Sequence, residues 1–178
     1  ADHKSLTHAA LDAVAFACTG SSYLLGARRE AEILAAAQAE YGVPIETAAG
    51  AILRALKAMR ASRLFVVSPY PDWLRDAGVA YWQEAGIDVV GTATVPIGRA
   101  DTRGIYELQG ADAAAVLARL DPHDADAVLV SGTGMPTLDM LRARRTQSPP
   151  TISSNLCLAW RLHRFVPGGA ALPQDLLL

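Results

Sequence analysis

Short apolar runs alternate along this chain with longer segments in which apolar side chains recur at helical spacing. Strands are predicted over residues 13–17, 43–46, 63–67, 87–95, 127–130 and 151–152. Helices are predicted over residues 23–41, 48–61, 72–85, 110–120, 136–145 and 154–164, with the end of another helix over 5–11 and a loop over 96–106. Because the strands are short and uniformly apolar, the alternation predicts an α/β fold whose parallel sheets are covered by helices on both faces.

Two strand–turn–helix units of this pattern are similar to each other. In the first, the apolar residues 14–17 run into the small polar turn 18–21, and in the second, residues 128–130 run into the turn 131–134. This weak internal repeat predicts two similar lobes that face each other across a cleft. Ligands of such sheets bind beyond the carboxyl ends of the strands, which is where both turns are expected to lie.

The composition narrows the classes of function. The chain has 178 residues, of which 51% are hydrophobic and 19% charged, as in a globular protein. Its net charge of −2 gives no reason to expect nucleic acid or a membrane surface as a partner, and no apolar run is long enough for a membrane span. Two cysteines predict a reducing, cytoplasmic environment rather than a disulfide framework, and the four histidines lack zinc-ligand spacing.

Cys18 is the most informative side chain, because it ends a predicted strand and precedes the small polar residues 19–22. A thiolate in that place can act as a nucleophile or base, and a thiol as an acid. The alternative is a small buried hydrophobic residue, and the sequence leaves both interpretations open. The hydroxyl and backbone N–H groups of residues 19–22 suit a carboxylate or a developing enolate, or simply cap a helix.

Further candidates follow the later strands. Tyr70, held between two prolines, has a hydroxyl that can donate to a carboxylate, although a surface turn is the alternative. Residues 131–134 form a second small polar turn but lack the Gly-Lys-Ser/Thr ending of a P-loop, which excludes a nucleoside triphosphate site of that type. Cys157 lies on an apolar helical face and is assigned to the core. Asn155 either caps the last helix or reaches the cleft.

Four segments together resemble the aspartate/glutamate racemase superfamily, in particular its branch of arylmalonate decarboxylases and maleate cis-trans isomerases. These segments are residues 16–21, 67–70, 129–139 and 150–155. The resemblance extends over about residues 10 to 165. It implies two pseudo-symmetric, Rossmann-like α/β lobes with parallel sheets and with the active site in the cleft between them. It also implies chemistry on a small carboxylic acid that needs neither a cofactor nor a metal.

The resemblance also implies roles for particular residues. Members of the superfamily carry a cysteine at one or both of two facing positions, of which Cys18 matches the first and Gly132 the second. Thr19 and Tyr70 match residues that hold a substrate carboxylate. Thr102 stands where maleate isomerases have an asparagine. The full set expected to bind the carboxylate is Thr19, Gly20, Ser21, Tyr70, Gly132 and Thr133, with Thr102, Ser131 and Asn155 as further candidates.

The lobe boundaries follow from the same comparison of segments. Residues 1–46 and 150–165 are assigned to the first lobe, residues 47–149 to the second, and residues 166–178 to a C-terminal tail. The superfamily's first strand is expected to precede residue 1, so the natural chain is predicted to be longer. Whether the protein forms a homo-oligomer is open.

Several functions remain in view. A malonate-type decarboxylase with Cys18 as its proton donor is favoured, because a decarboxylation that passes through an enediolate needs only one thiol. A maleate cis-trans isomerase and an aspartate/glutamate-type racemase are alternatives, of which the racemase is disfavoured because Gly132 supplies no second acid. A non-catalytic carboxylate-binding protein is the alternative from another class. A cysteine hydrolase is weaker still, because none of the histidines is placed at a strand end.

Overall fold

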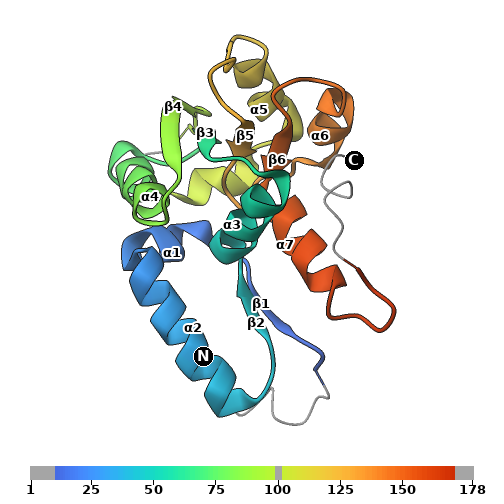
Figure 1. The fold of residues 1–178 in the computed structure, drawn as a ribbon. Coiled ribbons are helices and arrows are strands. Elements are labelled where there is room, and N and C mark those ends of the chain that lie inside the picture. Colours follow the sequence, from blue (N-terminus) through green and yellow to red (C-terminus); the bar gives the residue numbers. More distant parts are fainter. Residues whose placement is uncertain (1–10, 99–101, 171–178) are drawn as a thin grey trace.

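The computed structural model describes residues 11–98 and 102–170. Strands and helices alternate through most of this part of the chain, and every strand pairing in it is parallel (Figure 1). The predicted α/β class with parallel sheets is therefore confirmed. Of the predicted helix end at 5–11 only Leu11 lies within the described residues, and of the tail only residues 166–170 do.

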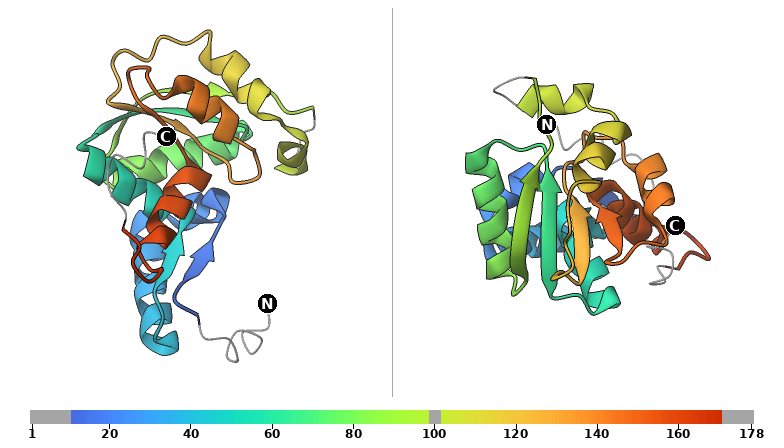
Figure 2. Two further views of the ribbon diagram at one scale, coloured as in Figure 1. Left: turned by 90° about the vertical axis from the view of Figure 1, so that its right-hand side faces the viewer. Right: turned by 90° about the horizontal axis from the view of Figure 1, so that it is seen from above.

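The larger sheet has four strands in the order β4-β3-β5-β6. These are β3 (Arg63–Ser68), β4 (Asp88–Thr94), β5 (Ala127–Val130) and β6 (Thr151–Ser153). Helices α5 (Gly110–Leu117) and α6 (Leu138–Arg144) lie on one side of this sheet, and α3 (Ala48–Met59) and α4 (Asp72–Glu84) on the other (Figure 2). All four residues of β5 are completely buried, which explains why this central strand is apolar throughout.

The smaller sheet consists of β1 (Val14–Phe16) and β2 (Ile45–Thr47), with α1 (Thr19–Leu25) and α2 (Ala27–Tyr41) between them in sequence. This sheet and α2 extend away from the four-stranded sheet (Figures 1 and 2). The junction between the two parts is partly ionic. Buried Glu46 of β2 accepts hydrogen bonds from Arg54 of α3 at 2.9 Å and from Arg161 of α7 (Ser154–His163) at 3.0 Å.

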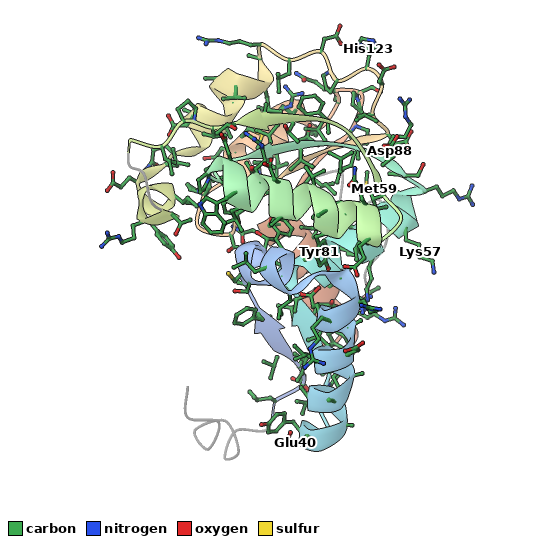
Figure 3. The ribbon with its side chains drawn as sticks, turned by 90° about the vertical axis from the view of Figure 1, so that its left-hand side faces the viewer. Glu40, Lys57, Met59, Tyr81, Asp88 and His123 are labelled. Atoms are coloured by element: carbon green, nitrogen blue, oxygen red, sulfur yellow. The ribbon has the colours of Figure 1, made fainter. Side chains whose placement is uncertain are left out.

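A second junction joins α4 to the first two helices. Figure 3 shows Tyr81 on α4 facing α1 and α2. The Tyr81 hydroxyl donates to one carboxylate oxygen of buried Glu30 at 2.5 Å, and the Ser22 hydroxyl donates to the other at the same distance. Burial is the main reason that the pKa of Tyr81 is raised, so this phenol stays protonated. The Glu30 carboxylate therefore links α1, α2 and α4.

The chain differs from the sequence-based prediction in two places. The predicted helix over 23–41 is two helices, because Gly26 adopts φ 80°, a conformation that a continuous α-helix does not allow. The first of them also begins earlier than predicted, at Thr19. The predicted loop over 96–106 contains a 3-10 helix, η2 (Thr102–Glu107), whose Gly104 and Ile105 are buried.

The strand pairing bears on the predicted lobe boundaries. Strand β6 pairs with β5, so residues 151–153 belong to the same sheet as β3 and β4. The helix that follows, α7, packs against α3 and β2 and so reaches the smaller sheet. The assignment of residues 150–165 to the first lobe stays a prediction. No helix in the described part of the chain combines the length and apolar character of a membrane span.

Candidate active site

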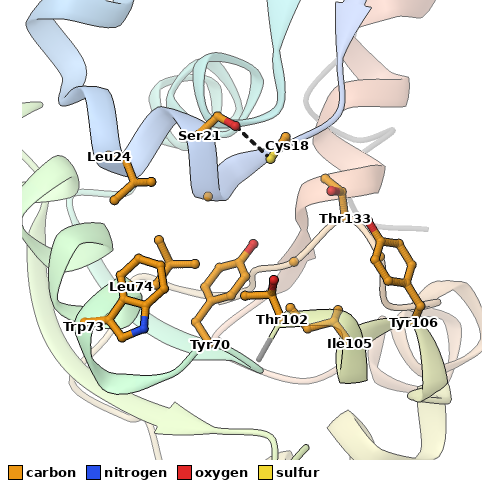
Figure 4. A pocket seen from close by; sticks show the side chains of 13 residues that line it. Cys18, Ser21, Leu24, Tyr70, Trp73, Leu74, Thr102, Ile105, Tyr106 and Thr133 are labelled. Carbon is orange, nitrogen blue, oxygen red and sulfur yellow. Dashed lines mark hydrogen bonds between the residues drawn. The ribbon is translucent and has the colours of Figure 1, made fainter. Parts of the chain in front are cut away.

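A cavity of about 260 Å³ lies where the carboxyl ends of β1, β3 and β5 meet (Figure 4). Polypeptide that follows each of these strands contributes to it, and η2 closes another side. The sequence-based expectation of a site beyond the strand ends thus corresponds to a real cavity. Its lining consists of Cys18, Gly20, Ser21, Leu24, Tyr70, Trp73, Leu74, Thr102, Ile105, Tyr106, Gly132, Thr133 and Gly134.

Cys18 is the residue that precedes α1, and its backbone is extended with φ −150°. Its thiol is free and partly exposed. The Ser21 hydroxyl, on the first turn of α1, donates a hydrogen bond of 3.1 Å to the Cys18 sulfur (Figure 4). The helix was expected to begin near Tyr23, but its start at Thr19 is what places the Ser21 side chain above the sulfur.

Tyr70 reaches the cavity from the turn after β3 and points toward the loop that carries Cys18 (Figure 4). Its phenol oxygen lies 2.6 Å from the hydroxyl oxygen of Thr19, and both residues are buried. Burial raises the pKa of Tyr70 to about 12. The phenol is therefore protonated throughout the physiological range and is available as a hydrogen-bond donor.

The turn after β5 approaches the cavity with its backbone. Gly132 has φ 124°, a conformation that side chains disfavour, and a Cβ atom there would lie 3.2 Å from the Pro69 ring. Its N–H donates to the Ser154 hydroxyl at 3.2 Å. The Thr133 hydroxyl donates to the carbonyl oxygen of Ala17 at 2.7 Å, which ties this turn to the end of β1.

Seven of the predicted site residues line the cavity together: Cys18, Gly20, Ser21, Tyr70, Thr102, Gly132 and Thr133. Three others lie behind its surface. Thr19 is buried against Tyr70, buried Ser131 is bonded to Tyr23, and the Asn155 amide donates to the Thr133 carbonyl at 3.1 Å. The binding roles of all these residues stay predictions.

Tyr23 is a site residue that the sequence-based interpretation missed. Its phenol oxygen lies 2.7 Å from the Ser131 hydroxyl oxygen, and its ring meets Tyr70 edge-on with centroids 6.0 Å apart. Burial raises its pKa, so it too is a neutral donor. The local sequence does not predict the bond between Tyr23 and Ser131, because Tyr23 was assigned to a helix without any further role.

The apolar wall of the cavity was also not predicted. It is formed by Leu24, Trp73, Leu74, Ile105 and Tyr106. Trp73 and Leu74 lie on the same side, below Leu24 (Figure 4). None of the residues described in the lining is an Asp, Glu, Lys or Arg, so the cavity combines hydroxyl and backbone groups with apolar surface. Within residues 11–98 and 102–170 no three His, Cys, Asp or Glu side chains gather as a metal site would require.

Comparison with known proteins identifies the family. The family model described as arylmalonate decarboxylase matches residues 1–173. The chain belongs to the arylmalonate decarboxylase family. It is 27% identical over 159 residues to an arylmalonate decarboxylase from Bordetella bronchiseptica and 25% identical over 182 aligned positions to a maleate isomerase from Pseudomonas putida. These alignments cover 85% and 94% of this chain.

Solved structures of the arylmalonate decarboxylase family share the fold. A crystal structure of arylmalonate decarboxylase matches with a TM-score of 0.78 and 25% identity over 90% of this chain and 71% of that one. A Nocardia farcinica maleate cis-trans isomerase with a covalently bound succinylcysteine intermediate matches with a TM-score of 0.83 and 22% identity, over 97% of this chain and 74% of that one. The predicted resemblance and the two-lobe fold are therefore confirmed. The chain spans 64% of the length of the Bordetella relative and 71% of the Pseudomonas relative.

Proposed function

We propose that this protein is a cofactor-independent decarboxylase of a small malonate-type dicarboxylic acid, with Cys18 as the proton donor. One observation carries the proposal. The lining described for the cavity contains a single thiol, Cys18, together with a glycine, Gly132, at the position where a second thiol is expected. Such a site can deliver a proton from one face of an intermediate but cannot exchange protons between two faces.

One side of the cavity suits the carboxylate that the product retains. The neutral Tyr70 phenol lies there, hydrogen-bonded to the Thr19 hydroxyl behind the cavity surface, and Gly20 and residues 132–134 border the same space. Donors of this kind stabilise the enediolate that forms when the neighbouring carboxylate leaves. Each well-placed donor contributes on the order of 10²–10³ in rate in comparable sites.

The apolar wall suits the carboxylate that departs as CO2. A carboxylate placed against this wall, where Leu74 and Ile105 are buried, would lose part of its water without gaining a cationic partner from the described lining, which has no Lys or Arg. Loss of neutral CO2 moves that charge away from the apolar wall and onto the enediolate. The same wall offers space for an apolar substituent on the malonate.

The chemical step balances with one thiol. The bond between the α-carbon and the departing carboxylate breaks, CO2 leaves, and the electron pair remains on the substrate as an enediolate. The Cys18 S–H bond then breaks as a new C–H bond forms at the α-carbon, so the negative charge passes to sulfur. The thiolate takes a proton from water to restore the thiol, and one proton is consumed in each turnover.

A maleate isomerase is the second candidate. The alignment with the Pseudomonas maleate isomerase covers 94% of this chain, and the partly exposed Cys18 sulfur faces the cavity as a nucleophile would. In that case the thiolate adds to the double bond of maleate, the adduct rotates, and the thiolate is expelled as fumarate forms. The apolar wall and the absence of a cation in the described lining fit a dianion of this size less well.

The test is to incubate the purified protein separately with phenylmalonate, malonate, maleate and L-aspartate. CO2 release, fumarate formation and loss of optical rotation are followed. CO2 release from phenylmalonate that disappears in Cys18→Ala supports the decarboxylase. Fumarate as the main product establishes the isomerase instead. Binding of the acids without turnover of any of them would point to the non-catalytic alternative.

A further inference from the structure

The contact between Ser21 and the Cys18 sulfur gives Ser21 a role of its own. Resting on the function proposed above, we propose that Ser21 is a positioning residue whose hydroxyl stabilises the Cys18 thiolate, rather than a ligand of the substrate carboxylate. The hydroxyl oxygen lies 3.1 Å from the sulfur, well inside the range for a hydrogen bond to sulfur. Because a sulfur atom gains acceptor strength as it becomes charged, this contact favours the thiolate over the thiol.

Proton counting separates the two roles of Ser21. A serine hydroxyl has one proton to donate. In the structure that proton is directed to the Cys18 sulfur, so the hydroxyl cannot donate to a carboxylate at the same time. If Ser21 donated to the substrate carboxylate instead, the Cys18 sulfur would lose this hydrogen bond. Tyr70, which lines the cavity, remains as the donor for the carboxylate, and its phenol oxygen then accepts a hydrogen bond from the Thr19 hydroxyl.

The Ser21 hydroxyl is important to the thiolate because the described lining of the cavity contains no positively charged side chain. Among the residues described in the cavity lining, the titratable groups besides Cys18 are two tyrosines, Tyr70 and Tyr106. Neither supplies a positive charge, and burial keeps Tyr70 protonated. A thiolate in this cavity therefore relies on neutral donors for stabilisation.

Two buried carboxylates on the elements near Ser21, Glu30 and Glu46, already have hydrogen-bond partners. Ser21 also borders a second, mostly apolar cavity of about 610 Å³ between α2 and the smaller sheet, where Glu30 and Tyr41 are the titratable groups in the described lining. Glu30 is bonded to Ser22 and Tyr81. Glu46 of β2 is paired with Arg54 and Arg161 and does not line the cavity that holds Cys18.

In the decarboxylation, the hydrogen bond acts when the thiol gives up its proton. The S–H bond breaks, the α-carbon receives the proton, and the negative charge moves from the enediolate to sulfur. The Ser21 O–H bond stays intact, and its hydrogen bond to Cys18 stabilises the negative charge on sulfur. In an isomerase the same contact would raise the fraction of Cys18 present as the nucleophilic thiolate, so it serves either chemistry.

Alkylation of Cys18 by iodoacetamide tests this role without a substrate. The rate of Cys18 modification is measured by peptide mass spectrometry at about pH 7 and about pH 10 in the wild type, Ser21→Ala, Ser21→Thr and Ser21→Val. Threonine and valine have nearly the same shape, and both are β-branched, so this pair differs chiefly in the hydroxyl. Cys157 is completely buried, and the fraction of it modified reports unfolding within the same sample.

We expect Ser21→Ala and Ser21→Val to be alkylated about tenfold more slowly than the wild type and Ser21→Thr near neutral pH, because one hydrogen bond to a charged group is lost. Near pH 10, above the ordinary pKa of about 8.5 of a cysteine side chain, the difference should disappear. Equal rates near pH 7 would overturn the inference. So would a defect that persists near pH 10, because it would indicate altered access to the sulfur.

Turnover measurements separate this inference from the proposed function. If the decarboxylase proposal holds, Ser21→Val lowers kcat with little change in KM, whereas loss of a carboxylate ligand would raise KM. If no tested acid is turned over but the alkylation pattern is as expected, the proposed function fails and the role of Ser21 stands. If Ser21→Val raised KM and left the alkylation rate unchanged, Ser21 would be a ligand of the substrate carboxylate, and the inference would be overturned.

Discussion

The phenol oxygen of Tyr23 lies 2.7 Å from the hydroxyl oxygen of Ser131, although 108 residues separate them in the sequence. Tyr23 belongs to α1, which follows Cys18, and Ser131 directly precedes Gly132. The bond therefore fixes α1, which follows β1, relative to the turn after β5. Both residues are buried, so water cannot replace either partner.

Removal of this bond should lower the stability of the protein. Tyr23→Phe keeps the ring that packs against Tyr70 and leaves the Ser131 hydroxyl without this partner, at an expected cost of about 1–3 kcal/mol in the free energy of unfolding. Tyr106→Phe is the matched control, because that side chain is exposed. Chemical denaturation of the two variants gives the comparison, and equal stabilities would show that the Tyr23–Ser131 bond contributes nothing.

The two cysteines should differ in their effect on activity. Cys18→Ala removes the proton donor and is expected to lower kcat by about 10²–10⁴-fold. Cys157→Ala is the matched control, because Cys157 is buried in α7, away from the cavity, and its burial raises its pKa. Rates of CO2 release measure both. Comparable losses in the two variants would contradict the assignment of Cys18.

Gly132 should tolerate substitution poorly. Any side chain there must adopt φ near 124° and approach the Pro69 ring at 3.2 Å, so Gly132→Ala should destabilise the fold by about 1–3 kcal/mol. Gly98→Ala is the control, because a Cβ atom at Gly98 would meet none of the described side chains or backbone within 4 Å beyond its chain neighbours. Thermal denaturation of the two variants compares their melting temperatures. An unchanged melting temperature for Gly132→Ala would show that this turn accepts a Cβ atom.

The handedness of the product should reveal which thiol delivers the proton. Cys18 protonates the enediolate from one face, whereas a relative with its thiol at the position of Gly132 would protonate the other. A malonate with a phenyl and a methyl substituent should therefore give the opposite enantiomer of the monoacid from the two enzymes. Chiral chromatography reads the result, and formation of the same enantiomer would rule out delivery by Cys18.

Alkaline pH should weaken the fold through Tyr70. Burial raises the pKa of Tyr70 from 10.0 to about 12, so the folded state resists an ionisation that the unfolded state allows. The resulting stability is fully present below pH 10 and is lost as the pH rises through about 12. The shift corresponds to about 2–3 kcal/mol.

Tyr70→Phe isolates that contribution. Burial also raises the pKa values of Tyr23 and Tyr81, so the wild type should lose stability at high pH for several reasons. The difference between the wild type and Tyr70→Phe should shrink across this window. Denaturation midpoints recorded at intervals of pH supply the test, and a difference that does not vary with pH would refute the assignment.

The elements that the sequence predicted well are those whose own residues determine them. Strand β5 is apolar throughout because it is buried throughout, and the last helix was predicted from residue 154 and begins there, after the N-cap Ser153, whose hydroxyl accepts a hydrogen bond from the N–H of Leu156 at 3.2 Å. The break at Gly26 was missed, because good helix formers continue on both sides of it. There the positive φ of one glycine outweighs the propensity of its neighbours.

The predicted site residues divide in the same way. Cys18 and Tyr70 follow recognisable strands, so their arrival at one cavity follows from the rule for parallel sheets. The contact of Ser21 with sulfur depends on where α1 starts, and the apolar wall depends on how η2 and α4 pack. Those features arise from tertiary packing, which no local pattern encodes.

Three hydrogen bonds fasten the polypeptide around Cys18 to the turns after β3 and β5: Thr19 with Tyr70, Tyr23 with Ser131, and Thr133 with Ala17. Moving the polypeptide around Cys18 away from these two turns would break all three bonds. A ligand therefore meets donors that are already aligned and loses little affinity to reorganisation of the protein. Substrates should enter and products leave through the existing mouth of the cavity, so that passage through this opening limits the size of the acid.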